Sequence, residues 1–129
     1  MTVTREQFEG FVREALEKIP EPVKRRISNV AVVVEDEMRS ARRSELPITR
    51  QGELLGLYQG VPLGRRGGGY NLVLPDKITI FQIAIERIAG PDPEKIKRQA
   101  QLTVWHEIAH HLGMSEPEVR AWERRRRGN

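Results

Sequence analysis

The chain has 129 residues, a length typical of one compact domain, which excludes a two-domain enzyme with a separate cofactor-binding half. Its 38% hydrophobic residues suffice for a core, and the absence of cysteine excludes disulfides, Cys-ligated zinc, iron–sulfur clusters and thiol catalysis. The net charge of +4 suggests a nucleic-acid partner, but residues 120–127 hold five arginines and one glutamate and so account for all of it.

The chain begins with a predicted helix and a predicted strand. Apolar residues recur at helical spacing over 8–19, Thr4 and Gln7 form a capping box before them, and Pro20 ends the segment. The β-branched run 30–34 is too short for a helix and is followed by acidic residues, which is typical of a buried strand. A helix therefore precedes the first strand.

Two further strands are predicted in the middle of the chain. Residues 37–50 alternate charges with little periodicity, and we expect a loop or a short helix there. Residues 54–58 predict a second strand, in which Gly56 marks a bulge or a close backbone approach. The glycine-rich stretch 60–75 is expected to be a mobile loop, and residues 77–81 predict the third strand.

Two helices are predicted to follow the third strand. Residues 82–89 have a helical pattern that glycine and proline then interrupt. Asp92 as N-cap and Pro93 at the first helical position begin a long helix. That helix is expected to run to Leu112 and to end at Gly113.

A last helix completes the predicted domain. Ser115 and Glu118 form a second capping box for a helix that runs to about Arg126. The order of elements predicts the α+β class, with a small sheet of three or more strands covered by helices. We expect residues 1–129 to form a single domain with a basic tail, 124–129, which is a solvated terminus and not a nucleic-acid site.

The start of the chain predicts a cytoplasmic protein without a membrane partner. No apolar run approaches the roughly 18 to 20 residues needed to cross a bilayer. Seven charged residues lie among the first eighteen, where a signal peptide would have an apolar stretch.

All three histidines lie in the long predicted helix, in a string that reads H-E-x-x-H followed by x-x-G-x-x-E. His106 and His110 fall about 40° apart and one turn apart on the same helix face, so both imidazoles can bind one ion. Glu107 projects beside this pair, close enough to act as a general base toward a water on the ion. The spacing predicts a metal clamp with an adjacent carboxylate.

A catalytic zinc site needs a third protein ligand, and Glu116 is the candidate. Gly113 can reverse the chain just past the helix end in a left-handed conformation, and Glu116 begins the next helix three residues later. Glu118, which the capping box occupies, and Glu123, seven residues beyond Glu116, are the competing carboxylates. We therefore predict zinc bound by the two histidines of the motif and Glu116.

Each part of the motif also has a purely structural interpretation. The histidine pair can belong to the core or to the surface of an amphipathic helix, Gly113 is an ordinary helix stop, and Glu116 suits the positive end of the next helix. His111 lies about 100° from His110 on the helix, off the ligand face. We expect it to support the ligands from behind or to pack in the core.

At these residues the chain resembles the zincin metallopeptidases, and specifically a small bacterial zincin-like family of about this length. The resemblance covers most of the chain and includes Leu54–Leu63 and Leu74–Phe81. It implies a minimal zincin fold, in which a short sheet and a supporting helix pack under the metal helix. It also implies that the motif's histidines are ligands and that Glu107 is the general base. The family's third ligand is typically aspartate, so Glu116 lengthens the reach by one methylene.

The sequence therefore predicts a zinc-dependent peptidase that acts on peptide or protein substrates. The metal polarises the scissile carbonyl, while Glu107 takes a proton from the attacking water and delivers it to the leaving amine. The alternative is a catalytically silent metal-binding or partner-binding module with the same fold. Only 16 residues follow Gly113, so a shallow cleft would need an oligomer or a protein partner to hold a substrate.

Two other parts of a peptidase site have candidates. Tyr58 and Tyr70 are candidates to stabilise the oxyanion, with strand packing as the alternative for Tyr58 and a place in a loop as the alternative for Tyr70. The strand 78–81 is expected to line the cleft and to pair with an extended substrate, as cleft-edge strands do in zincins.

Overall fold

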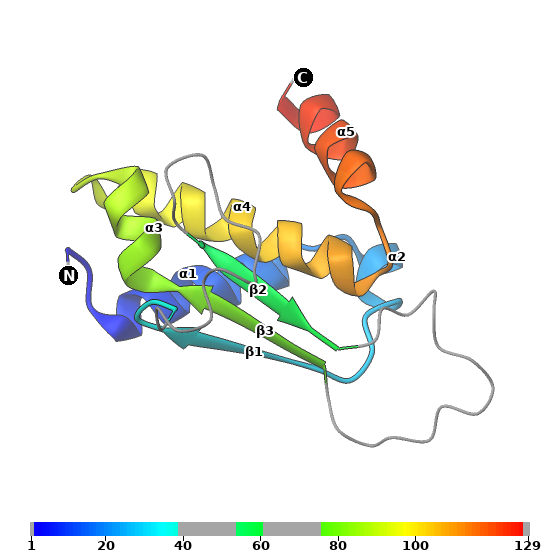
Figure 1. Cartoon of the computed structure of the whole chain (residues 1–129), viewed down its shortest axis with the longest axis horizontal. Coiled ribbons are helices and arrows are strands. Elements are labelled where there is room, and N and C mark those ends of the chain that lie inside the picture. Colours follow the sequence, from blue (N-terminus) through cyan, green and yellow to red (C-terminus); the bar gives the residue numbers. More distant parts are fainter. Residues whose placement is uncertain (1, 39–53, 61–75, 128–129) are drawn as a thin grey trace.

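Figure 1 shows the computed structural model of the protein, which describes residues 2–38, 54–60 and 76–127. The predicted helices and strands occur in the predicted order, and the α+β class is confirmed. In chain order the elements are α1 (Arg5–Glu17), α2 (Glu21–Lys24), β1 (Val30–Glu35), β2 (Gly56–Gln59), β3 (Asp76–Phe81), α3 (Gln82–Ala89), α4 (Pro93–His111) and α5 (Glu116–Arg127).

The three strands form a mixed sheet with β3 at its centre. β1 pairs with β3 in parallel, with Val32 opposite Ile78, and β2 pairs with β3 antiparallel, with Tyr58 also opposite Ile78. Because both edges of β3 are paired, the prediction that residues 78–81 pair with a substrate is wrong. Among the strands that the structure describes, β2 and β1 are the edge strands.

One face of the sheet packs against α1 and α4 to form the core (Figure 1). Ile78 and Ile80 of β3 are fully buried on this face, since alternate residues of a strand point to the same side. Within the same core, α4 contacts α1, α3, β2 and β3, so it is the central helix of the fold. The fully buried helix residues in this core are Phe8 and Ala15 of α1 and Ile96, Ala100 and Val104 of α4.

The helix ends follow the predicted capping residues. Thr4 and Gln7 form the reciprocal capping box of α1, with the Gln7 amide donating to Thr4 Oγ1 at 3.0 Å and the Thr4 amide donating to Gln7 Oε1 at 2.8 Å. At the start of α4, the Asp92 carboxylate accepts from the Glu94 amide at 2.9 Å. These side chains satisfy amides that have no partner within the helix.

The short helix α2 was not predicted from the sequence. The prolines at its start indicate the end of α1, but they also suit a helix start, because a first-turn proline lacks only an amide hydrogen that the helix does not use. Pro20 is the N-cap of α2, and Pro22 lies in its first turn. The same prolines therefore end one helix and begin the next.

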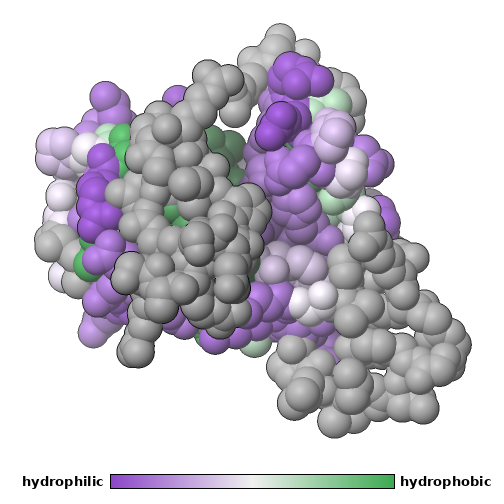
Figure 2. All heavy atoms as spheres, viewed as in Figure 1, coloured by the Kyte–Doolittle hydropathy of each residue, from purple (hydrophilic) through white to green (hydrophobic). Residues whose placement is uncertain are grey.

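The last helix, α5, projects away from the sheet and the other helices (Figure 1). Its surface is mainly hydrophilic, as the same view in Figure 2 shows. Val119 is fully buried and anchors the first half of the helix. α5 is thus joined to the rest of the fold mainly through α4.

Some sequence predictions cannot be placed on this fold. Most of the predicted loop or short helix over 37–50, nearly all of the predicted loop over 60–75, and Tyr70 lie outside the described residues. No helix in the described part of the chain combines the length and the apolar composition needed to cross a bilayer.

An acid-sensitive contact joins α1 to α4. The Glu14 carboxylate accepts from Gln101 Nε2 at 2.6 Å and from Lys97 Nζ at 3.1 Å, and it lies 3.3 Å from Lys18 Nζ. The Gln101 hydrogen bond and, after it, the two lysines lower the pKa of Glu14 from its ordinary 4.5 to about 2. Because the folded-state pKa is the lower one, this carboxylate stabilises the fold above about pH 4.5, and the contribution is lost as the pH falls toward 2.

We therefore expect Glu14→Gln to lower the thermal unfolding midpoint at about pH 6 and to have little effect near pH 2. Midpoints of wild type and variant across this range measure the difference directly. Glu94→Gln, which removes an exposed carboxylate from α4, is the control for a general effect of charge. A difference between wild type and Glu14→Gln that persists at the lowest pH would show that the ionised carboxylate is not its source.

Candidate metal centre

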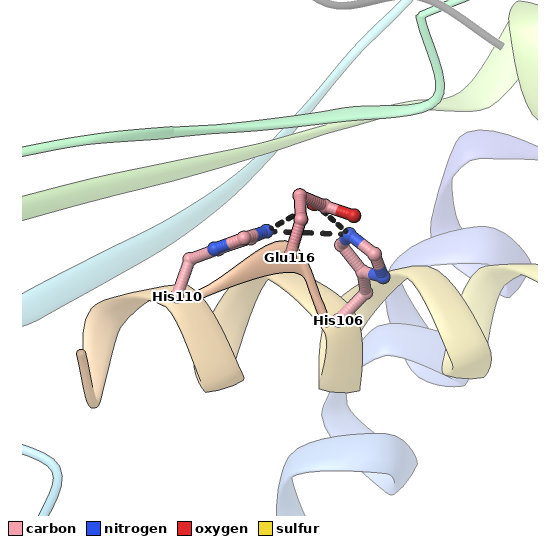
Figure 3. A group of neighbouring side chains, drawn as sticks. All are labelled: His106, His110 and Glu116. Atoms are coloured by element: carbon pink, nitrogen blue, oxygen red, sulfur yellow. Dashed lines mark hydrogen bonds and ion pairs between the residues drawn. The ribbon is translucent and has the colours of Figure 1, made fainter. Parts of the chain in front are cut away.

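Three side chains from the end of α4 and the start of α5 point toward one another (Figure 3). His106 Nε2 and His110 Nε2 lie 3.3 Å apart, and Glu116 Oε1 lies 3.0 Å from the first and 2.7 Å from the second. No other group of three or more histidine and acidic side chains in the described ranges could hold a metal ion in this way.

The turn after α4 brings Glu116 back to the histidines. Gly113 has φ +94°, a left-handed backbone conformation that residues other than glycine rarely adopt. Its amide donates to the His110 carbonyl at 2.9 Å and the Met114 amide to the Ala109 carbonyl at 3.0 Å, which is the Schellman pattern. The predicted capping box follows, because Ser115 and Glu118 bind each other's amides at 3.4 and 2.9 Å. The turn and the cap place Glu116 in the first turn of α5, beside the end of α4.

Both imidazoles have a hydrogen-bond acceptor behind them. His106 Nδ1 lies 3.2 Å from Glu123 Oε2, and His110 Nδ1 lies 3.2 Å from the Met114 carbonyl oxygen. A carbonyl or a carboxylate can only accept, so each Nδ1 carries the hydrogen in this arrangement. With its hydrogen on Nδ1, a neutral ring offers the Nε2 lone pair to a metal ion, whereas an imidazolium ring donates through Nε2 to Glu116 Oε1.

The donor set fits a zinc ion. Two imidazole nitrogens and one carboxylate oxygen are a common protein ligand set of catalytic zinc, with a fourth position for water. Ligand atoms about 2.1 Å from a tetrahedral ion lie about 3.4 Å from one another. The observed separations of 2.7 to 3.3 Å require only small side-chain movements to reach that spacing.

The charges of the site influence one another. Burial lowers the pKa of His106, but the hydrogen bond that its ring donates to Glu123 and the charges of Glu107 and Glu116 outweigh it, so the pKa is raised. Burial raises the pKa of Glu116, but its hydrogen bonds to the two imidazoles outweigh this and the pKa is lowered. The acidic side chains therefore favour positive charge at this place, as a cation site requires.

Glu107 lies beside the group under strand β2 and is only 9% exposed. A Cβ atom on Gly56 would come within 2.8 Å of Thr103 Cγ2 and 3.1 Å of Glu107 Cγ. The close backbone approach predicted for this glycine is thus confirmed. The strand also supplies a backbone hydrogen bond from Tyr58 to the Glu107 carboxylate. Burial is the largest influence on the pKa of Glu107 and raises it, despite the neighbouring imidazoles.

The third histidine belongs to a buried network on another side of α4. His111 Nδ1 lies 3.0 Å from Asp76 Oδ2, and Tyr58 Oη donates to the same oxygen at 2.6 Å. The Ser28 amide donates to His111 Nε2 at 3.2 Å, so the ring is neutral with its hydrogen on Nδ1. The network ties β2, β3 and the segment before β1 to α4.

The network also bears on the oxyanion candidates. The Tyr58 hydroxyl binds Asp76 and the Tyr58 ring packs edge-on against His111, with ring centroids 5.8 Å apart. These contacts correspond to strand packing, the structural alternative for Tyr58. The predicted oxyanion role of this hydroxyl has no support in its contacts.

Sequence reasoning missed Asp76, and it named Glu123 only as a competing ligand and not as the partner of His106. Asp76 has the same strand parity as the buried Ile78 and Ile80, which is a signal that it faces the core. Glu123 is spaced seven residues, two helical turns, from Glu116, so both lie on one face of α5. This spacing shows that Glu123 can reach the site, although it does not show which histidine nitrogen it meets.

Comparison with known proteins agrees with this geometry. Residues 27–126 match a family model described as a zincin-like metallopeptidase. A search of the curated proteins finds no match. The matched range contains all three strands, α4 and most of α5, so it includes every side chain of the group of three. The small mixed sheet under the helix that carries H-E-x-x-H is consistent with a minimal zincin fold.

Proposed function

This chain belongs to the zincin-like metallopeptidase family, and from that premise we propose that it hydrolyses peptide bonds with a zinc ion held by His106, His110 and Glu116. The observation that carries the proposal is the meeting of these three ligand atoms next to the buried carboxylate of Glu107. Neighbouring elements hold the base and a ligand in place, because Gly56 of β2 packs against Glu107 and Glu123 of α5 contacts His106.

When bound, zinc supplies a Lewis acid that polarises the scissile carbonyl and makes a water molecule more acidic. Glu107 accepts the proton of the attacking water and then delivers it to the leaving amine. The raised pKa of Glu107 suits both steps, since a carboxylate with a higher pKa is a stronger base. The backbone hydrogen bond from Tyr58 holds the carboxylate in position.

We propose that the substrate lies along β2 and not along β3. The Phe81 amide donates to the Leu55 carbonyl at 2.9 Å. Because the backbone groups of successive residues in an antiparallel strand point alternately to its two edges, those of Leu57 also face β3. The backbone groups of Gly56 then face the other edge, where an extended peptide can add as a strand, whereas the Tyr58 amide already donates to Glu107. A second protein chain or another copy of this chain would complete a shallow cleft.

Metal analysis tests the ligand set. We expect about one zinc per chain after purification without a histidine tag, and little zinc in His106→Ala or His110→Ala. Circular dichroism shows whether each variant is folded, and Glu118→Gln is a control on α5 that leaves all three ligands intact. Equal zinc content in wild type and both histidine variants would show that this is not a metal site.

A further inference from the structure

One face of α5 carries the two acidic side chains that meet the candidate metal centre. Glu116, Arg120 and Glu123 lie at positions i, i+4 and i+7, within about 60° of one another around the helix. Glu116 Oε1 meets the two imidazoles, Arg120 Nε lies 3.5 Å from Glu116 Oε2, and Glu123 Oε2 lies 3.2 Å from His106 Nδ1. Helix α5 thus supplies Glu116 as the third ligand and also contacts His106 on the ring nitrogen opposite the ion.

We propose that Glu123 is a positioning residue of the metal centre, which accepts the Nδ1 hydrogen of His106 and so holds Nε2 toward the ion. This inference rests on the proposed function, because it assigns a role relative to the proposed zinc site. Glu123 itself is not a ligand, since it approaches the ring nitrogen that points away from Glu116.

The chemistry of imidazole explains why an acceptor is needed here. A neutral ring has one hydrogen, so binding a metal through Nε2 leaves that hydrogen on Nδ1. A half-buried N–H without a partner would cost free energy, and a carboxylate partner also makes the ring a stronger donor to the metal. The Glu123 side chain is 19% exposed, so water competes little for this contact.

The two histidines differ in the partner that they use. His110 donates to the carbonyl of Met114, which follows directly from the turn after α4 and needs no particular side chain. His106 lies one turn earlier, and the partner that its Nδ1 meets is a side chain from α5. Substitution can therefore remove the partner of His106 and leave that of His110 in place.

Arg120 does not have a comparable role. Its side chain is 69% exposed, and 3.5 Å is a long contact for an ion pair in water. Glu123 is both closer to its partner and better shielded. The inference is therefore confined to Glu123.

Two substitutions separate the functions of the Glu123 carboxylate. Glu123→Gln keeps an oxygen that can accept from Nδ1 but removes the charge, whereas Glu123→Met has a similar length and no strong acceptor. Glu118→Gln is the matched control, because it makes the same change of charge on the same helix and glutamine still serves a capping box. His106→Ala reports on the site itself.

The experiment measures zinc dissociation constants of the full chain by competition with a chelator, and the visible absorption spectrum of each protein loaded with Co²⁺. We expect Glu123→Met to weaken zinc binding by about 10- to 100-fold and Glu123→Gln by less, with wild-type affinity in Glu118→Gln. The Co²⁺ bands should shift in Glu123→Met, because the ring of His106 is no longer held in one orientation. Thermal melts of the metal-free proteins show whether each variant is folded. If Glu123→Met does not fold, the zinc affinity of Glu123→Gln relative to Glu118→Gln tests the inference.

The remaining outcomes overturn the inference in different ways. Wild-type affinity and spectrum in Glu123→Met would mean that His106 needs no partner. An equal loss in Glu123→Gln and Glu118→Gln would assign the effect to the charge of α5 and not to this contact. Weak binding that is the same in wild type and His106→Ala would remove the zinc site of the proposed function, and the role of Glu123 with it.

Discussion

Glu107→Gln is expected to reduce kcat/KM for peptide cleavage by about 100- to 10,000-fold while zinc content remains that of wild type. The amide keeps the size of the buried side chain, which packs closely under Gly56. It cannot accept a proton from water, so the chemical step loses its base. The two imidazoles and Glu116 are untouched, so zinc binding is retained.

Digestion of a peptide library by wild type and Glu107→Gln, with zinc content measured on the same samples, tests this expectation. Glu94→Gln is the control, because it removes an exposed carboxylate from the same helix far from the site. Equal turnover by Glu107→Gln and wild type would exclude Glu107 as the base. Zinc binding without turnover by either protein would favour the alternative of a metal-binding or partner-binding module.

Glu116→Ala is expected to weaken zinc binding by more than the 10- to 100-fold that loss of a partner behind a ligand causes, because a ligand itself is lost. Glu116→Asp keeps a carboxylate at the place where the resemblance to the family implies an aspartate, so it should retain the metal. The two nearby carboxylates cannot easily replace Glu116. Glu118 caps α5 through Ser115, and Glu123 faces the other nitrogen of His106.

Titration of each protein with zinc against a chelator measures the difference. Glu118→Gln controls for the loss of a negative charge from the first turn of α5. Wild-type affinity in Glu116→Ala would place the third ligand elsewhere, even with both histidines in place. Loss of zinc in Glu116→Asp as well would show that the longer side chain is needed to reach the ion.

The predictable parts of this structure depend on residues close together in the sequence. Thr4 and Gln7 are three residues apart, Asp92 and Glu94 two, and each pair fixes a helix start through its own hydrogen bonds. The turn at Gly113 is equally local. The H-E-x-x-H spacing belongs to the same class, because the geometry of one helix places both histidines on one face.

The parts that sequence reasoning missed depend on residues far apart. The order of the strands follows from packing across the whole sheet, so the central place of β3 was not predictable from its own apolar pattern. His111 and Asp76 are 35 residues apart, and neither has a pattern that names the other. Glu123 was predictable as a residue near the site, but its partner nitrogen depends on the angle between α4 and α5.

The buried pair of His111 and Asp76 fixes the rotational phase of α4. His110 and His111 are adjacent, and consecutive helix residues point about 100° apart, so one faces Glu116 while the other faces the sheet. A turn of the helix by one residue would bring His111 toward Glu116 and leave Asp76 without its imidazole. Because Asp76 is 2% exposed, losing this partner would leave a buried carboxylate less well compensated, which would be costly. The pair therefore selects which of two neighbouring, chemically identical side chains reaches the metal centre.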